Sequence, residues 1–265
     1  MIRLAVFDID RTLIPPETGK LAEETRMALQ ELRERGIATS IASGRQMQQL
    51  PSDLRGIEFD FFILSNGTYV TNSDGTVLHQ ESIDTDTVRQ LAEDMQCREL
   101  PMEIRYIRGF CRVDPARRIE DFIAQYWNQP FQTEVPDRET IIPQPGEAPI
   151  SCAAIIPPEE HAWFEQKYPQ LDFLPVFGMP LCDVNKSGVS KATGLEIICA
   201  HMGISLAETI AFGDDRNDLE MIEAAGIGVA MGEANEDARA AADYLTDFSR
   251  NLGVVKGLRH FQLIK

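Results

Sequence analysis

Short apolar runs alternate with helical patterns over the first part of the chain. The run 4–7 (Leu-Ala-Val-Phe) ends at acidic residues, which is typical of a parallel strand buried on both faces. A helix is predicted over 21–35 and closed by Gly36, and two more buried strands are predicted over 37–42 and 59–64. This alternation predicts a doubly wound α/β sheet whose ligands bind at the carboxyl ends of the strands.

The pattern changes after the third strand and later returns. Segments 68–72 and 76–80 flank a Gly-containing turn and predict a hairpin. Between 82 and 183 we expect helices over 84–100, 116–127 and 159–168, strands over 102–107, 110–113 and 151–156, and a Pro-rich surface loop over 136–149. Later we expect helices over 191–202, 217–224, 235–242 and 254–261, and strands over 209–212, 228–230 and 244–246.

These elements predict two domains. Residues 1–81 and 184–265 form a discontinuous α/β core with a doubly wound, Rossmann-like parallel sheet. Residues 82–183 form an inserted α+β cap domain with a sheet of its own.

The overall charge narrows the classes of partner. The chain has 25 Lys plus Arg against 42 Asp plus Glu, a net charge of −17, which argues against nucleic acid or an anionic membrane as its main partner. No run approaches the ~20 apolar residues of a membrane span, and charged residues interrupt the first ten positions, so we expect a cytoplasmic protein. Five cysteines without a CxxC pair predict buried thiols, not a disulfide framework or a zinc site.

The first candidate for chemistry is Asp8-Ile9-Asp10-Arg11-Thr12, directly after the first strand. Where a strand ends, the backbone can turn so that Asp8 and Asp10 meet one ligand. One carboxylate can then act as nucleophile and metal ligand while the other moves protons. The alternative is a pair of exposed loop acids that cap the next segment, and the two acids alone do not decide between these interpretations.

Two further motifs offer groups for an anion. In Ser43-Gly44-Arg45 a hydroxyl and a freed backbone N–H can hold a phosphoryl oxygen, although an ordinary helix N-cap has the same residues. The third motif is Ser187-Gly188-Val189-Ser190-Lys191, and it places Lys191 in the first turn of the helix predicted over 191–202. The helix dipole disfavours a cation there unless an anion binds beside it, and a solvated surface lysine is the alternative.

The fourth motif is Gly213-Asp214-Asp215-Arg216-Asn217-Asp218, between a buried strand and a helix. Crowded acids repel one another, and a divalent cation would offset that cost; oxygen ligands indicate Mg²⁺. One of Asp214 and Asp218 can bind the metal while the other orients the site. An acid-rich helix start explains one or two of these residues but not the set.

Taken in order, the four motifs resemble those of the haloacid dehalogenase superfamily, and more narrowly its Cof-like phosphatases with a type-II (C2B) cap. Ser65-Asn66-Gly67 and the segments 228–234 and 241–246 add to the resemblance, which covers the predicted core; in the middle of the chain only the α+β cap topology is matched. The resemblance implies a Mg²⁺-dependent phosphatase that acts on a small phosphorylated metabolite. Sugar phosphates are the expected substrate class, because a lid-like cap would enclose a small ligand.

The resemblance also implies a role for each motif residue. Asp8 would attack phosphorus to form an aspartyl-phosphate, and Asp10 would protonate the leaving oxygen and then activate water. Asp8, the backbone carbonyl of Asp10 and Asp214 would ligate Mg²⁺, with Asp218 steadying the metal shell. The phosphate- and substrate-binding residues implied are Ser43, Gly44, Arg45, Lys191 and Asn217.

Arg11 departs from the family pattern, which usually has Gly at this position. At positive φ an arginine would strain the loop by about 1 kcal/mol or more, whereas at negative φ it is harmless. One hypothesis is that Arg11 contacts the substrate, and another is that it holds the loop against the cap. A phosphosugar mutase that uses Asp8 and Asp10, and a non-catalytic phosphometabolite-binding protein, stay open as alternatives.

The predicted cap carries five arginines within fourteen residues: Arg105, Arg108, Arg112, Arg117 and Arg118. In so acidic a chain this cluster could draw an anionic substrate. The alternative is that a hairpin and a helix merely expose their arginines.

Overall fold

The computed structural model describes the chain except for residues 55, 108, 114–118, 120, 123–136 and 139–146. The described residues form two compact units. The first unit consists of residues 1–45, 50–79 and 190–265, and the second of residues 46–49 and 80–189. Most of the second unit is therefore inserted, along the chain, between two parts of the first.

The first unit is built on an eight-stranded sheet with the order β14-β13-β12-β1-β2-β3-β4-β5. The pairs from β14 to β3 are parallel, and β4 joins β3 antiparallel. The chain order reverses between β1 and β12, and such a switch point opens a crevice at the carboxyl ends of the strands. The strands are β1 Leu4–Phe7, β2 Ala38–Ala42, β3 Phe61–Leu64, β4 Tyr69–Asn72, β5 Val77–Gln80, β12 Thr209–Gly213, β13 Ile227–Ala230 and β14 Tyr244–Leu245.

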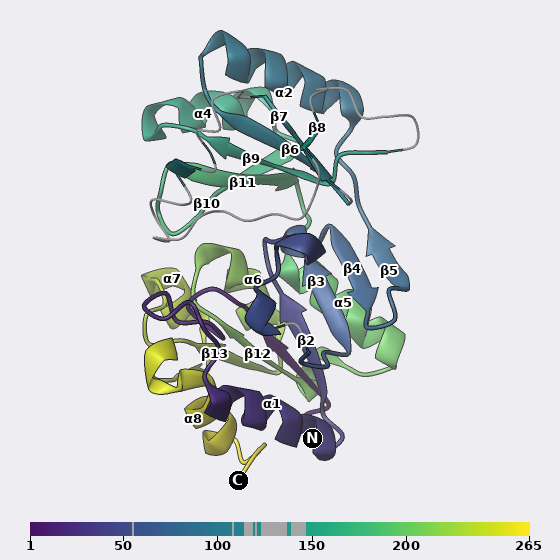
Figure 1. Cartoon of the computed structure of the whole chain (residues 1–265), viewed down its shortest axis with the longest axis vertical. Helices are drawn as coiled ribbons and strands as arrows, with labels where there is room; N and C mark the ends of the chain where they lie inside the picture. Colours follow the sequence, from purple (N-terminus) through teal and green to yellow (C-terminus); the bar gives the residue numbers. More distant parts are fainter. Residues whose placement is uncertain (55, 108, 114–118, 120, 123–136, 139–146) are drawn as a thin grey trace. The chain divides into compact units, whose positions relative to one another are not determined.

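Helices cover both faces of this sheet (Figure 1). Ala5 and Phe7 of β1 pack in one apolar cluster with α1 (Glu23–Glu34) and α8 (Gly253–His260). Leu4 and Val6 pack in another cluster with α5 (Lys191–Met202) and α6 (Leu219–Ala224). Two buried faces explain why β1 is an unbroken apolar run. The helix α7 (Glu236–Ala241) follows β13.

The second unit has a six-stranded sheet with the order β10-β11-β9-β6-β7-β8. Its pairs are antiparallel except for the parallel pair of β7 and β8. Two helices, α2 (Thr85–Cys97) and α4 (Pro158–Lys167), share one apolar cluster with side chains of β6, β9, β10 and β11. The strands are β6 Met102–Tyr106, β7 Gly109–Arg112, β8 Asp137–Arg138, β9 Ser151–Ile155, β10 Leu171–Pro175 and β11 Leu181–Lys186.

The predicted fold class, a doubly wound α/β sheet accompanied by an α+β part, is confirmed. The helix predicted over 116–127 falls largely outside the described residues. In the segment expected to be a loop, 136–149, the structure has the short strand β8, while 139–146 lie outside the described residues. Single-turn 3₁₀ helices add detail that the pattern did not predict: Met47–Gln49, Ser52–Leu54, Ser65–Gly67, Leu206–Glu208, Arg216–Asp218 and Ser249–Asn251.

All five cysteines lie in the described part of the chain, and none is disulfide-bonded. Four are buried, but Cys97 is exposed, so the expectation of a buried thiol is wrong there. Cys97 ends α2, whose buried face consists of Val88, Leu91, Ala92 and Met95. A residue two positions after Met95 lies off that face, because neighbours on a helix surface are three or four residues apart.

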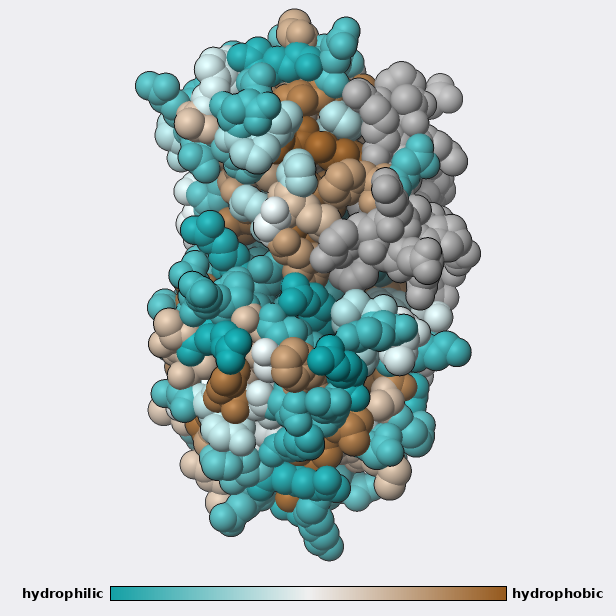
Figure 2. All heavy atoms as spheres, turned by 90° about the vertical axis from the view of Figure 1, so that its left-hand side faces the viewer, coloured by the Kyte–Doolittle hydropathy of each residue, from teal (hydrophilic) through white to brown (hydrophobic). Residues whose placement is uncertain are grey.

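The face of the molecule in Figure 2 carries hydrophilic side chains over much of its surface, with apolar patches among them. Within the residues that the structure describes, no helix combines the length and apolar character needed to cross a membrane.

Of the five clustered arginines, Arg105 and Arg112 are described. Arg105 is 7% exposed, and its guanidinium lies 3.0 Å from both Glu103 Oε1 and Asp183 Oδ1. Arg112 lies over the ring of Phe110, with its Cζ 4.8 Å from the ring centroid. Arg105 is thus held in an ion-pair network of the second unit, which neither interpretation of the arginine cluster predicted.

Candidate active site

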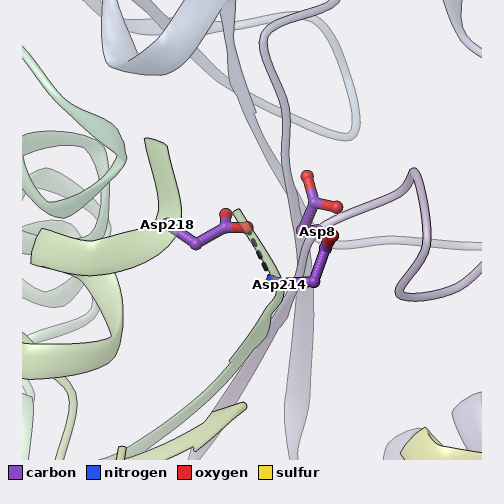
Figure 3. A group of neighbouring side chains, drawn as sticks. All are labelled: Asp8, Asp214 and Asp218. Atoms are coloured by element: carbon purple, nitrogen blue, oxygen red, sulfur yellow. Dashed lines mark hydrogen bonds between the residues drawn. The ribbon is translucent and has the colours of Figure 1, made fainter. Parts of the chain in front are cut away.

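Three carboxylates meet at the carboxyl ends of β1 and β12 (Figure 3). Asp8 follows β1, Asp214 follows β12, and Asp218 ends the turn Arg216–Asp218. Each offers an oxygen within 4.8 Å of the others, and the three residues are only 6%, 1% and 0% exposed. Because uncompensated buried charges cost several kcal/mol each, these carboxyl groups need either cations nearby or protons of their own.

Lys191 supplies one of these cations. Its Nζ lies 2.8 Å from Asp8 Oδ1 and 2.6 Å from Asp218 Oδ1, and the side chain is fully buried. Burial opposes the charge of Lys191, but the attraction of Asp218 and Asp8 outweighs it and raises the pKa of the ammonium group. The alternative interpretation of Lys191 as a solvated surface lysine is therefore wrong.

Asp214 is one of the residues that could hold a metal ion. Its Oδ1 accepts a 3.5 Å hydrogen bond from Thr12 Oγ1. Its Oδ2 is buried and has no hydrogen-bond partner among the described residues, although Arg11 Nε lies 3.4 Å away. A buried carboxylate oxygen without such a partner, next to two more carboxylates, fits a hard divalent cation such as Mg²⁺.

Asp218 uses both of its oxygens within the protein. Oδ1 accepts from Lys191, and Oδ2 accepts the backbone N–H groups of Asp214 and Asp215 at 2.9 and 3.1 Å. The carboxylate thereby holds the loop that presents Asp214. This arrangement is compatible with the prediction that Asp218 orients the site, and its role toward the metal stays a prediction.

Asp10 lies outside the group of three carboxylates. Arg45 binds it through two 2.8 Å contacts, from Nε to Oδ2 and from the second terminal nitrogen to Oδ1. Backbone hydrogen bonds to Ile9 O from the N–H groups of Thr12 and Ile14 close the loop after Asp8. The structure thus places the predicted substrate-binding residue Arg45 on the predicted acid–base residue Asp10.

Ser43 and Gly44 follow β2, next to Arg45. Ser43 is 2% exposed, and its Oγ accepts the backbone N–H of Arg45 at 3.2 Å. This local contact is what the turn-capping interpretation expects. Gly44 is half-buried. A phosphate contact by Ser43 or Gly44 stays a prediction.

Asn217 donates a 2.9 Å hydrogen bond from Nδ2 to Asn66 Oδ1. Asn66 belongs to the turn Ser65–Gly67 after β3 and was not assigned to the site from the sequence. The signal was the sequence Ser65-Asn66-Gly67 itself: all three residues have positive φ, at 48°, 55° and 100°. Asn and Gly are the residues that adopt this conformation most readily.

Gly67 brings this turn against the start of α5. A β-carbon added to Gly67 would lie 2.0 Å from the carbonyl oxygen of Ser190, the residue before Lys191. We predict that Gly67→Ala lowers the free energy of unfolding by about 2–4 kcal/mol, because it combines left-handed strain with a backbone clash. Urea unfolding monitored by circular dichroism measures this loss.

Gly36→Ala is the matched control for that measurement. Gly36 has a φ of 75°, but a β-carbon there would meet nothing within 4 Å, so only the strain of about 1 kcal/mol is expected. If Gly67→Ala and Gly36→Ala lower the free energy of unfolding equally, the close approach of Gly67 to the Ser190 carbonyl oxygen does not contribute to stability.

The buried carboxylates hold their protons more tightly than exposed ones do. Burial, with further contributions from Asp218 and Asp10, raises the pKa of Asp8 to about 8, although Lys191 opposes the shift. Burial, with the charges of Asp8 and Asp218, also raises the pKa of Asp214 well above its ordinary value, while Arg11 opposes that shift. Without a metal, ionising both groups is therefore costly.

These shifts predict a pH dependence of stability. A carboxyl whose pKa is raised by folding stabilises the folded state fully below its ordinary pKa of 3.8, and this contribution is lost as the pH rises through the raised pKa of about 8. A divalent cation held by the ionised carboxylates would oppose this loss. We expect the increase in Tm on adding Mg²⁺ to grow between pH 5.5 and pH 8. A constant or shrinking increase in calorimetric scans would contradict this prediction.

Comparison with known proteins identifies the family. A profile described as haloacid dehalogenase-like hydrolase matches residues 5–258. The HMP-PP phosphatase of Citrobacter koseri is 28% identical over 271 residues, covering 98% of this chain and 96% of that protein. A Streptococcus pyogenes protein, whose name pairs a phosphatase with a peptidyl-prolyl cis-trans isomerase, is 27% identical over 280 residues. The alignment covers 99% of this chain but only 54% of that relative.

Solved structures agree with the sequence matches. A sugar phosphatase of HAD subclass IIB superposes with a TM-score of 0.88 at 28% identity, covering 99% of this chain and 100% of that one. The family profile extends over nearly the whole chain and includes all four motifs. The chain therefore belongs to the haloacid dehalogenase-like hydrolases.

Proposed function

We propose that this enzyme is a Mg²⁺-dependent phosphatase that hydrolyses small phosphomonoesters, with sugar phosphates as the substrate class. The observation that carries the proposal is the buried group of Asp8, Asp214 and Asp218, with the ammonium of Lys191 in contact with Asp8 and Asp218. Carboxylate oxygens and one ammonium are the groups that stabilise a transferring phosphoryl group and its metal. The phosphatases among the relatives, one of them a sugar phosphatase, support the substrate class.

The first half-reaction uses Asp8 as nucleophile. A carboxylate oxygen of Asp8 forms a bond to phosphorus as the bond from phosphorus to the ester oxygen breaks, and an aspartyl-phosphate results. Asp10 gives the leaving oxygen its proton. Lys191, which contacts Asp8 Oδ1 at 2.8 Å, balances the charge that spreads over the phosphoryl oxygens.

The second half-reaction returns the enzyme to its starting state. Asp10 accepts a proton from water as the water oxygen attacks phosphorus, and the bond to Asp8 breaks to release inorganic phosphate. Asp8, Asp214 and the backbone carbonyl of Asp10 would hold Mg²⁺, which when bound supplies further charge neutralisation. Arg45 contacts each oxygen of Asp10 once, which leaves a second lone pair on each oxygen for the proton transfers.

The proposal is tested by measuring phosphate release from a panel of sugar phosphates, nucleotides and pyridoxal phosphate, with Mg²⁺ and with EDTA. Metal-dependent release, highest for a sugar phosphate, is the expected result, and Asp8→Asn is the control for a contaminating phosphatase. Movement of the phosphoryl group to a second position of the substrate without release would identify a mutase instead. Binding of phosphate esters without any turnover would identify a non-catalytic binding protein.

A further inference from the structure

Arg11 combines a strained backbone with a position beside the acidic group. Its φ is 64°, which lies in the left-handed region. This is the position where the family pattern usually has Gly. Such a conformation costs about 1 kcal/mol or more for a side chain of this size and persists only where the surroundings hold it in place. The alternative with positive φ and backbone strain therefore applies to Arg11.

Three contacts hold Arg11 in place. Its backbone N–H donates to Ile14 O at 2.9 Å. A terminal guanidinium nitrogen donates to the carbonyl oxygen of Glu233 at 3.0 Å, and Nε lies 3.4 Å from Asp214 Oδ2. The backbone of this loop and the terminal nitrogen of the side chain are both anchored, so Nε, the inner nitrogen of the guanidinium, is kept against Asp214.

The position of Arg11 matters for the charge balance at Asp214. Lys191 contacts Asp8 and Asp218 but has no such contact with Asp214 in the described structure. Asp214 is 1% exposed, and Oδ2 is its oxygen without a hydrogen-bond partner. Arg11 is the cation placed against that oxygen, and its own side chain is 27% exposed. The Arg11 side chain is therefore less buried than Asp214, the carboxylate that it contacts.

We propose that Arg11 is an internal counter-ion of the metal site: it partly neutralises Asp214 in the metal-free protein and competes there with Mg²⁺. This inference rests on the Mg²⁺ site of the proposed function. A divalent cation on Asp214 either displaces the guanidinium from Oδ2 or is repelled by it at short range, and both effects weaken metal binding. Arg11 thus stabilises the metal-free state and lowers the affinity for Mg²⁺.

The test is isothermal titration of the full chain with Mg²⁺ alone, at pH 8 and constant ionic strength. Arg11→Asn removes the charge while keeping a residue that tolerates the left-handed backbone. Arg11→Lys keeps the charge. Arg250→Asn is the matched control, since it also removes one positive charge from the first unit, but Arg250 is 50% exposed and pairs with Glu17.

We expect Arg11→Asn to bind Mg²⁺ about five- to tenfold more tightly than wild type, from the repulsion between a single and a double charge at short range. Arg11→Lys and Arg250→Asn should stay within about twofold of wild type, because a cation remains near Asp214 in both. The increase in Tm from metal-free protein in EDTA to protein in a fixed excess of Mg²⁺ should be larger for Arg11→Asn than for wild type.

Equal or weaker Mg²⁺ binding by Arg11→Asn, with wild type binding the metal, overturns the inference and leaves the proposed function standing. If neither wild type nor Arg11→Asn binds Mg²⁺, the proposed metal site is wrong, and the inference that rests on it is wrong too. A gain in affinity that Arg250→Asn shares also overturns the inference, because it would then reflect net charge and not the contact with Asp214.

Discussion

Replacing Lys191 by methionine is expected to lower the free energy of unfolding by about 3–5 kcal/mol in Mg²⁺-free buffer at pH 8, because one partner of a buried ion pair is lost. Lys191 is fully buried and contacts Asp8 and Asp218 at 2.8 and 2.6 Å. Methionine fills much of the same space but leaves both carboxylates without their cation. Denaturant unfolding of wild type and variant measures the difference.

Two comparisons isolate the buried charge. Lys256→Met removes an ion pair with Asp247 whose lysine is 51% exposed, so a loss below about 1 kcal/mol is expected. The double variant Lys191→Met/Asp218→Asn removes one of the stranded charges and should regain part of the stability. A loss for Lys191→Met no larger than that for Lys256→Met would contradict the account of the site.

Asp8→Asn is expected to lower kcat for phosphate release by about 10⁴-fold or more, since an amide cannot act as the nucleophile. The variant should nevertheless fold. Burial raises the pKa of Asp8 to about 8, which means that the folded protein disfavours its charge, so a neutral amide should leave the metal-free Tm at pH 8 unchanged or higher.

Single-turnover phosphate release and a thermal scan check both halves of this prediction. Asp74→Asn, at the exposed tip of the turn between β4 and β5, is the matched control and should keep wild-type kcat. Residual activity of Asp8→Asn above a hundredth of wild type, in protein free of contaminating phosphatase, would assign the nucleophile to another residue.

Much of the fold and of the site could be predicted because both depend on local pattern. An apolar run such as 4–7 indicates a strand buried on both faces, and the alternation with helices then implies a parallel sheet. Parallel strands place their carboxyl ends at one edge. Motifs that follow different strands, such as those at Asp8 and Asp214, were therefore expected to meet, and they do.

The rest of the site depends on contacts between residues far apart in the chain. Arg45 contacts both oxygens of Asp10, and Asn217 donates a hydrogen bond to Asn66. The periodicity of apolar residues does not predict which of these distant segments meet. The same holds for the reach of Arg11 to Asp214. Side-chain partners of this kind follow from how the loops after the strands are folded, not from the strands themselves.

The insertion of the second unit also has a consequence for synthesis on the ribosome. β1 is a central strand whose partners are β2, close in sequence, and β12, where Leu4 pairs with Thr209. Until β12 leaves the exit tunnel, one edge of β1 has no strand beside it, and an exposed apolar edge invites aggregation. Residues 80–189 emerge in the meantime and carry their own sheet and apolar cluster. The nascent chain can therefore fold its inserted part first, and Asp8 meets Asp214 and Asp218 only when the last third of the chain has been synthesised.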